Sequence, residues 1–344
     1  MSGPSINLVA IQAAVSASDY VSAAAFRSKI LGLSEEAVAG CGGAPTLLAF
    51  PELIGFPLLL ALDNEESVKA ARVSQGALSL VKRHWREVLG AAWRYRTAGL
   101  NTLYLWRALP AYRAYRAAFA EAARTFGVSI VAGTTFLPWL EQEVMRGLHI
   151  TDTRVYNTAF TFSPLGGLLG RTRKRYFTSG AESSSGLSSG PLSDLRPLRT
   201  PVGKVGVTVC LDAFYSSVIE RLDGLGAQII VQPSANDASW QRPWPGDPSF
   251  TEGEAWLEHG LRAQVQNRLN VQLGVNPMLV GNLWELTFRG RSSIVANTRF
   301  FSEAEVENRP GLVAIADTAD QAAWVRATLT LHDAPQPDLT QTPG

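Results

Sequence analysis

The sequence has few of the residues that support several common kinds of protein chemistry. Its 344 residues include two cysteines and four histidines. Two cysteines cannot form a disulfide framework, so the fold must depend on packing, which fits a reducing compartment. The cysteines and histidines also show no metal-ligand spacing, and no histidine lies in a motif with a cysteine. These scarcities argue against a metal centre and against a Cys–His nucleophile.

An excess of one charge and long apolar runs are missing as well. The 31 Lys and Arg residues balance 30 Asp and Glu residues, so the formal net charge is +1 at pH 7. The sequence therefore gives no overall electrostatic reason to bind nucleic acid. No apolar run reaches about 18 residues, and the N-terminus does not resemble an export signal. We expect a cytoplasmic protein without a membrane span.

Apolar residues make up 46% of the chain and form short runs bounded by turn residues. The runs predict strands at 6–12, 46–50, 128–137, 155–162, 168–176, 205–211, 228–233, 271–280, 292–296 and 312–316. Helices are expected up to about Gly40, over 65–126 with breaks near Gly99 and Pro110, and at 215–225, 252–269 and 321–331. This alternation predicts an α/β fold with helices covering a mixed sheet. We expect one domain over 1–331 and a loose tail over 332–344.

Three residues that can do chemistry stand at the ends of expected strands. Glu52 follows the strand 46–50, Lys174 lies at the end of another strand, and Cys210 comes directly before a helix. Carboxyl ends of strands are where α/β folds place reactive groups. Backbone N–H groups at a strand-to-helix turn can stabilise a thiolate or an oxyanion. Taken singly, each residue also has an ordinary interpretation, as a structural cysteine, a solvated lysine or a loop acid.

Together the three resemble the signature of the nitrilase superfamily of carbon–nitrogen hydrolases, a Glu-Lys-Cys triad. Glu52 lies in Leu-Ala-Phe-Pro-Glu-Leu (48–53), and Lys174 ends Gly-Arg-Thr-Arg-Lys (170–174) downstream of Tyr-Asn-Thr (156–158). Cys210 lies in Val-Gly-Val-Thr-Val-Cys-Leu-Asp (205–212). The resemblance covers about residues 6–318. It implies a four-layer αββα sandwich of the nitrilase type, assembled as a homodimer or higher homo-oligomer.

The resemblance also implies a mechanism. Cys210 attacks a carbonyl or nitrile carbon, Glu52 takes the thiol proton, and Lys174 and the backbone N–H of Leu211 hold the oxyanion. No metal or organic cofactor is required. We therefore expect hydrolysis of a small-molecule linear amide, carbamoyl compound or nitrile through a thioester or thioimidate. A thioester-mediated N-acyltransferase, a true nitrilase and a catalytically silent binding protein are the alternatives.

The sequence departs from the family pattern in three places. True nitrilases usually have Cys-Trp-Glu, whereas this chain has Cys-Leu-Asp (210–212), which favours an amidase. A second glutamate of the family corresponds to Glu141, to Glu143 or to neither, in which case both are solvent-facing charges, and the spacing does not choose among these. The stretch between Glu52 and Gly133 is unusually long, and within it 82–116 carries eight Lys or Arg, one acid and many aromatic residues. We interpret 82–116 as a lid or subunit interface rather than a membrane-binding or nucleic-acid-binding segment.

Position along the chain also suggests which residues contact the substrate. They follow the expected strand ends and are mostly apolar: Phe56, Trp139, Leu211, Phe214, Asn236 and Trp240. Their character predicts an apolar or aromatic acyl group rather than a small charged one. Ordinary core packing is the alternative for each of them.

Overall fold

The first strand shows why this chain stacks in layers. In the computed structural model, β1 (Ser2–Ala14) is apolar on both faces. Ile6 and Leu8 enter one core, whereas Val9 and Ile11 enter another. Successive side chains of a strand point to opposite faces, so β1 must be covered on both sides. The structure describes residues 2–143, 145–178 and 185–332.

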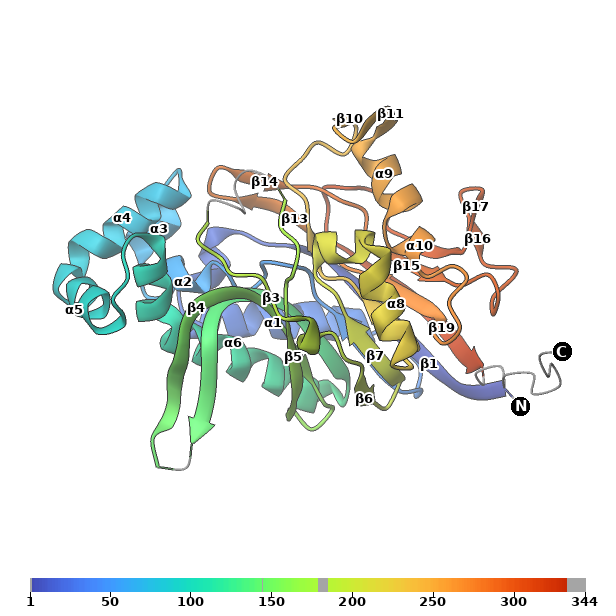
Figure 1. Ribbon diagram of the computed structural model, residues 1–344, viewed down its shortest axis with the longest axis horizontal. Coiled ribbons are helices and arrows are strands. Elements are labelled where there is room, and N and C mark those ends of the chain that lie inside the picture. Colours follow the sequence, from blue (N-terminus) through green and yellow to red (C-terminus); the bar gives the residue numbers. More distant parts are fainter. Residues whose placement is uncertain (1, 144, 179–184, 333–344) are drawn as a thin grey trace, which may run out of the picture.

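Two mixed sheets form the centre of the molecule (Figure 1). In the described part of the chain the larger sheet has nine strands: β14 (Leu286–Phe288), β13 (Met278–Leu283), β1, β2 (Thr46–Ala49), β3 (Ser129–Glu143), β4 (Gly147–Phe162) and β5 (Leu168–Arg173) in order, with β19 (Ala323–His332) on β1 and β9 (Ser234–Ala235) on β13. The smaller has six: β18 (Leu312–Ile315), β15 (Ser293–Ala296), β12 (Leu273–Asn276), β8 (Ile229–Val231), β7 (Gly203–Val207) and β6 (Leu198–Thr200).

Helices cover the outer face of each sheet. The helices are α1 (Ala23–Val38), α2 (Leu58–Ala61), α3 (Glu65–Lys69), α4 (Val73–Arg83), α5 (Trp85–Tyr95), α6 (Leu100–Phe126), α8 (Ser216–Gly224), α9 (Glu252–His259) and α10 (Leu261–Gln264). Short 3₁₀ turns occur at Ala17–Tyr20, Leu192–Asp194 and Cys210–Phe214, and two small hairpins pair β10 (Pro243–Trp244) with β11 (Asp247–Thr251) and β16 (Glu305–Val306) with β17 (Arg309–Pro310). No helix among the described residues is both long and apolar enough to cross a membrane.

Three apolar cores separate the four layers. The first lies between the nine-stranded sheet and α1 and α6, where Phe26 and Phe119 are fully buried. The second lies between the two sheets, and the third lies between the six-stranded sheet and α8 and α10. The layer order is therefore helix, sheet, sheet, helix, which confirms the αββα sandwich expected from the sequence.

Of the three passages from the smaller sheet to the larger one among the described residues, one leads from β18 to β19 and two lie earlier in the chain. The apolar run 271–280 predicted one strand, but it forms two, β12 in the six-stranded sheet and β13 in the nine-stranded sheet. Pro277 lies between them and has no N–H to continue a ladder. Residues 229–235 make the same passage, from β8 to β9. Both crossings lie beside the residues of the candidate site.

The sequence predicted a helix over 321–331, and this prediction is wrong. Residues 323–332 form β19, which pairs antiparallel with β1 along most of its length. Val325 and Leu331 are buried in the core between the sheets, and Ala327 and Leu329 pack against it. Alternate residues therefore face the core, and pairing with β1 outweighs the local helical preference.

Two helix boundaries also differ from the expectation. The predicted helix 252–269 is interrupted at Gly260, where a Cβ atom would lie 2.3 Å from the Trp256 carbonyl oxygen. Pro110 does not break its helix, because α6 continues through it. Burial of Tyr104, Tyr115 and Phe119 against the first core outweighs the roughly 3 kcal/mol that an interior proline costs.

Candidate active site

Glu52, Lys174 and Cys210 line one cavity of ≈ 340 Å³. Glu52 follows β2 and Lys174 follows β5, both in the nine-stranded sheet, whereas Cys210 follows β7 in the six-stranded sheet. The site therefore lies where the strand ends of the two sheets meet. The larger sheet therefore contributes Glu52 and Lys174 to the site, and the smaller sheet contributes Cys210.

The Glu52 carboxylate is hydrogen-bonded through both of its oxygens. It is 2% exposed, and its Oε1 accepts hydrogen bonds from Asn157 Nδ2 at 2.8 Å and from Lys174 Nζ at 3.0 Å. Its Oε2 accepts the backbone N–H of Ala235 at 3.1 Å. Lys174 is itself 1% exposed. A buried ion pair of this kind is held in place because either charge alone would be costly out of water.

Asn157 of β4 positions both members of this pair. Its side-chain amide donates to Glu52, and its carbonyl oxygen accepts the Lys174 backbone N–H at 2.8 Å. The Tyr-Asn-Thr motif therefore has a structural meaning, because its asparagine fixes the glutamate and the lysine with two groups of one residue. Sequence reasoning singled out the motif but gave its asparagine no role.

The loop that carries Glu52 is fixed by β3. Leu53 has a φ of +62°, and its N–H donates to the Thr134 hydroxyl at 2.9 Å. Gly133 has a φ of +67°, and a Cβ atom there would lie 2.0 Å from the Pro51 carbonyl oxygen. Tyr115 of α6 donates to the carbonyl oxygen of Ala132, which precedes this glycine. Only glycine permits this close approach.

Cys210 sits at a strained turn between β7 and α8. Its φ is +50°, a left-handed conformation that is uncommon for residues other than glycine and that often marks functional sites. Its N–H donates to the Pro233 carbonyl at 2.9 Å, and its carbonyl accepts from Gln232 Nε2 at 2.8 Å. The thiol lies 3.8 Å from the Ala235 carbonyl oxygen. Glu52 and Cys210 thus contact the N–H and the carbonyl of the same residue.

Asp212 fixes the turn from within. Its carboxylate accepts the backbone N–H groups of Val209, Arg175 and Tyr176, which ties the Cys210 turn to the segment after Lys174. Burial raises the pKa of Asp212 to about 6, because the loss of water outweighs these hydrogen bonds and the nearby Lys174 charge.

The rest of the cavity is largely aromatic. Seven aromatic side chains line it among the described residues: Phe56, Tyr104, Phe136, Phe214, Trp244, Trp256 and Phe288. Two further carboxylates, Asp237 and Glu252, lie at its wall. Glu252 is occupied, because it accepts from Arg242 Nε and from Trp256 Nε1, each at 3.3 Å.

The comparison with known families identifies the chain. The family model for carbon-nitrogen hydrolases matches residues 9–250. The chain belongs to the carbon–nitrogen hydrolase family. This confirms the family resemblance seen in the sequence. None of the curated protein sequences matches this carbon–nitrogen hydrolase chain significantly.

Solved structures of this family share the fold at low sequence identity. A carbon–nitrogen hydrolase from Helicobacter pylori G27 is 17% identical over 94% of this chain and 89% of its own, with a TM-score of 0.57. Nit3 of Saccharomyces cerevisiae, from branch 10 of the nitrilase superfamily, is 17% identical over 95% and 91%, also with a TM-score of 0.57. A variant amidase from Nesterenkonia sp. AN1, with an acetamide moiety covalently added at its active-site cysteine, is 16% identical over 95% and 90%, with a TM-score of 0.55.

Of the six expected substrate contacts of this carbon–nitrogen hydrolase, four line the cavity with the triad: Phe56, Leu211, Phe214 and Asn236. Trp139 does not. It lies further along β3, beyond a register shift at Pro138, and Arg171 and Arg173 stack on its ring at 3.1 and 4.1 Å. Side chains alternate along β3, so Trp139, three residues after the cavity residue Phe136, lies on the opposite face of the strand.

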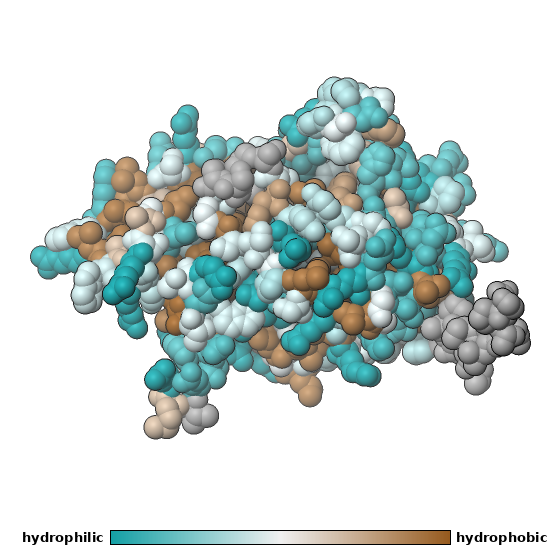
Figure 2. All heavy atoms as spheres, in the orientation of Figure 1, coloured by the Kyte–Doolittle hydropathy of each residue, from teal (hydrophilic) through white to brown (hydrophobic). Residues whose placement is uncertain are grey.

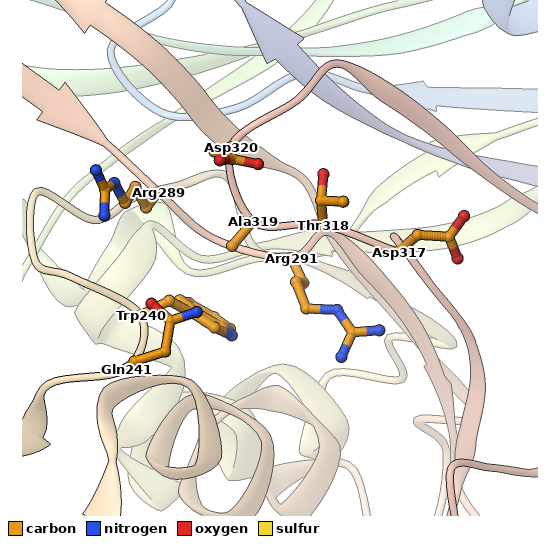
Figure 3. Close-up of a pocket in the computed structure, with 8 residues that line it drawn as sticks. All are labelled: Trp240, Gln241, Arg289, Arg291, Asp317, Thr318, Ala319 and Asp320. Carbon is orange, nitrogen blue, oxygen red and sulfur yellow. The ribbon is translucent and has the colours of Figure 1, made fainter.

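Trp240 lies outside this cavity as well. It lines a separate cavity of ≈ 390 Å³ with Arg289, Arg291 and Asp317, shown in Figure 3. Its ring lies 6.4 Å, between centroids, from that of Trp256, which lines the cavity with Glu52, Lys174 and Cys210.

Neither candidate for a second glutamate reaches the cavity. Glu141 and Glu143 are exposed near the tip of the β3–β4 hairpin, where Glu141 accepts from Trp139 Nε1 and Glu143 pairs with His149. β3 runs on to Glu143, well past its expected end at 137, and this carries both acids away from the triad. Among the described residues no group of three or more His, Cys, Asp or Glu side chains is placed to hold a metal ion.

Sequence reasoning missed several cavity residues, including Tyr104, Phe136 and Phe288. Phe136 offered a usable signal, because it lies in the expected strand 128–137, whereas Trp139 lies beyond it. Tyr104 lies within 82–116, the aromatic segment interpreted from the sequence as a lid or subunit interface, whereas Phe288 offered no signal, since it reaches the cavity from β14, which is distant in sequence from all three triad members.

We predict that Gly133→Ala lowers the free energy of unfolding by about 2–3 kcal/mol, because the added methyl collides with Pro51 and the backbone is left-handed. Urea unfolding measures the change. Gly42→Ala is the control, since nothing lies within 4 Å of a Cβ atom at Gly42. Equal effects of the two substitutions would contradict the account.

We predict a pH-dependent stability term from Asp212. Its raised pKa means that the folded state binds more protons than the unfolded state between about pH 4 and 6, so stability falls as pH rises through this window. The melting temperature of the protein relative to that of Asp212→Asn should therefore increase from pH 7 to pH 5. A difference that does not change with pH would exclude this role of Asp212.

Proposed function

We propose that the protein hydrolyses the carbon–nitrogen bond of a small linear amide through a thioester on Cys210. The observation that carries the proposal is the shared contact at Ala235, whose N–H binds Glu52 and whose carbonyl lies beside the Cys210 thiol. This geometry brings a base and a nucleophile to one cavity. The cysteine adduct described for the Nesterenkonia amidase supports the same chemistry here.

In the proposed first half-reaction the thiol proton passes to Glu52 as the sulfur attacks the carbonyl carbon. The oxygen of the tetrahedral intermediate is stabilised by the Lys174 ammonium and by the N–H of Leu211. Leu211 is the second residue of the 3₁₀ turn, where N–H groups have no acceptor within the turn. One such donor typically lowers a barrier by about 3–4 kcal/mol. Collapse of the intermediate breaks the C–N bond, and Glu52 returns the proton to the leaving ammonia or amine.

The second half-reaction restores the thiol. Glu52 removes a proton from water, the hydroxide attacks the thioester carbon, and the C–S bond breaks to release the carboxylic acid. The departing sulfur recovers its proton from Glu52. The carboxylate can act in both directions because the Lys174 ammonium and the Asn157 amide keep it in place throughout.

The substrate class follows from the cavity wall. Its aromatic side chains favour an apolar or aromatic acyl group, and ≈ 340 Å³ suits a small molecule. An arrangement as a homodimer or higher homo-oligomer, as in the family, remains part of the proposal.

We predict that incubation with a panel of apolar amides and nitriles gives a covalent acyl adduct on Cys210, detected by intact-protein mass spectrometry. Cys210→Ala should show no adduct and no ammonia release. Cys41→Ala, at the other free cysteine, is the matched control and should behave like the unaltered protein. An adduct that persists in Cys210→Ala, or ammonia release that persists there, would refute the proposal. Hydroxamate formed with added hydroxylamine would reveal acyl transfer.

We predict that Phe214→Ala raises KM for an aromatic amide roughly tenfold, equivalent to about 1.4 kcal/mol, because it removes one aromatic wall of the cavity. Alkylation of Cys210 by iodoacetamide should continue. Trp240→Ala is the comparison variant, since Trp240 lies outside this cavity, and its KM should change less. If Trp240→Ala raises KM more than Phe214→Ala, the assignment of the cavity is wrong.

A further inference from the structure

Helix α5 carries an apolar stripe on its outer face. Trp85, Leu89 and Trp93 follow one another at intervals of four residues, so they lie on one side of the helix. Their exposed fractions are 52%, 59% and 87%. Leu78 of α4, also exposed, adds to this surface. We call these four residues the outer stripe.

The opposite face of α5 already packs against the protein. Ala91 is buried there, and Val88 and Tyr95 pack against the first core. His84, at the junction of α4 and α5, lies against Trp106 of α6 with ring centroids 5.2 Å apart. The face of α5 that packs against the core is therefore a different face from the outer stripe.

Positive charge surrounds the outer stripe. Residues 72–99 contain six basic side chains and one acid, whereas the whole chain has a net charge of only +1. The basic residues are all exposed: Arg72, Lys82, Arg83, Arg86, Arg94 and Arg96. Arg86 lies over the Trp85 ring at 5.1 Å. The segment that carries the two exposed tryptophans therefore has a local excess of positive charge.

The position of these helices is also informative. α3, α4 and α5 project from one end of the molecule, opposite to the end where β1 begins (Figure 1). Over this end Figure 2 shows hydrophobic side chains next to hydrophilic ones. A projecting surface of this kind can meet a broad, flat partner without a matching groove.

We propose that the outer stripe and its arginines bind an anionic lipid surface, in place of the lid or subunit interface expected for 82–116 from the sequence. Tryptophan prefers the boundary between headgroups and acyl chains, and arginine binds lipid phosphates. A helix with an exposed Trp and Leu face and a basic flank lies in the plane of such a boundary. The surface is a poor contact for a second copy of the chain, because a twofold interface would set its positive charges against themselves.

Helix α4 reaches the cavity wall at its first residue. Val73, the first residue of α4, lines the cavity, and its N–H donates to the Glu285 carboxylate at 2.8 Å. Trp284 Nε1 donates to the Ser67 carbonyl in α3 at 2.7 Å. α4 has eleven residues and is about 16 Å long, so the cavity lies about one short helix from α5. Lipid binding would hold the cavity close to the membrane surface.

Co-sedimentation of the purified full-length protein with vesicles tests the proposal. The vesicles are phosphatidylcholine alone and phosphatidylcholine containing phosphatidylglycerol. We expect binding to the anionic vesicles that weakens with added salt. The variant Trp85→Ser/Leu89→Ser/Trp93→Ser should bind at least tenfold more weakly, and Arg86→Gln/Arg94→Gln several-fold more weakly. Exposed surface substitutions change stability little, so both should fold, as circular dichroism will check.

The matched control is Leu225→Ser/Leu269→Ser, which removes two exposed leucines outside α4 and α5 and should bind like the unaltered protein. Cys210→Ala should also bind normally, which separates this proposal from the proposed hydrolysis. Absence of vesicle binding by the unaltered protein would overturn the inference. So would equal binding by the triple variant, or a change of oligomeric state in that variant without vesicle binding, which would show a protein interface instead.

Discussion

The buried carboxylate of Glu52 is the constraint on which the rest of the site depends. A carboxylate removed from water costs several kcal/mol unless opposite charge and hydrogen-bond donors replace the water. Asn157, Lys174 and Ala235 supply them, and they lie 105, 122 and 183 residues away in the sequence. Three distant segments must therefore meet at Glu52 before its burial becomes tolerable, so folding and assembly of the site are the same event.

The stacking of two sheets makes this meeting possible. A single sheet would bring Glu52 and Lys174 to one edge, but Cys210 belongs to the other sheet. The crossing from β8 to β9 joins them, because Ala235 pairs with β13 of the larger sheet while residues 229–231 remain in the smaller one. Asp212 then holds the Cys210 turn against the segment after Lys174. The layers therefore set the separation of Cys210 and Glu52.

Features that depend on local sequence pattern could be predicted from the sequence, whereas features that depend on distant partners could not. Strands that are apolar on both faces, such as β1, predict covered layers from local pattern alone, and reactive residues at strand ends predict the triad. The identity of β19 required knowledge of its partner, because only pairing with β1 decides between helix and strand there. The position of Trp139 depended on which face of β3 meets the cavity, and the stacking of the layers decides this, not the local pattern. Errors thus arose where long-range pairing overrides local preference.

The cavity contains more carboxylates than the proposed chemistry uses, and their surroundings distinguish them. Glu252 has its oxygens engaged by Arg242 and Trp256, and Asp237 is exposed to water. Glu52 alone among these three contacts the residue that also touches the Cys210 thiol. Proton transfer needs hydrogen-bond reach before it needs a suitable pKa. Of the three carboxylates, geometry therefore favours Glu52 as the base of the proposed chemistry.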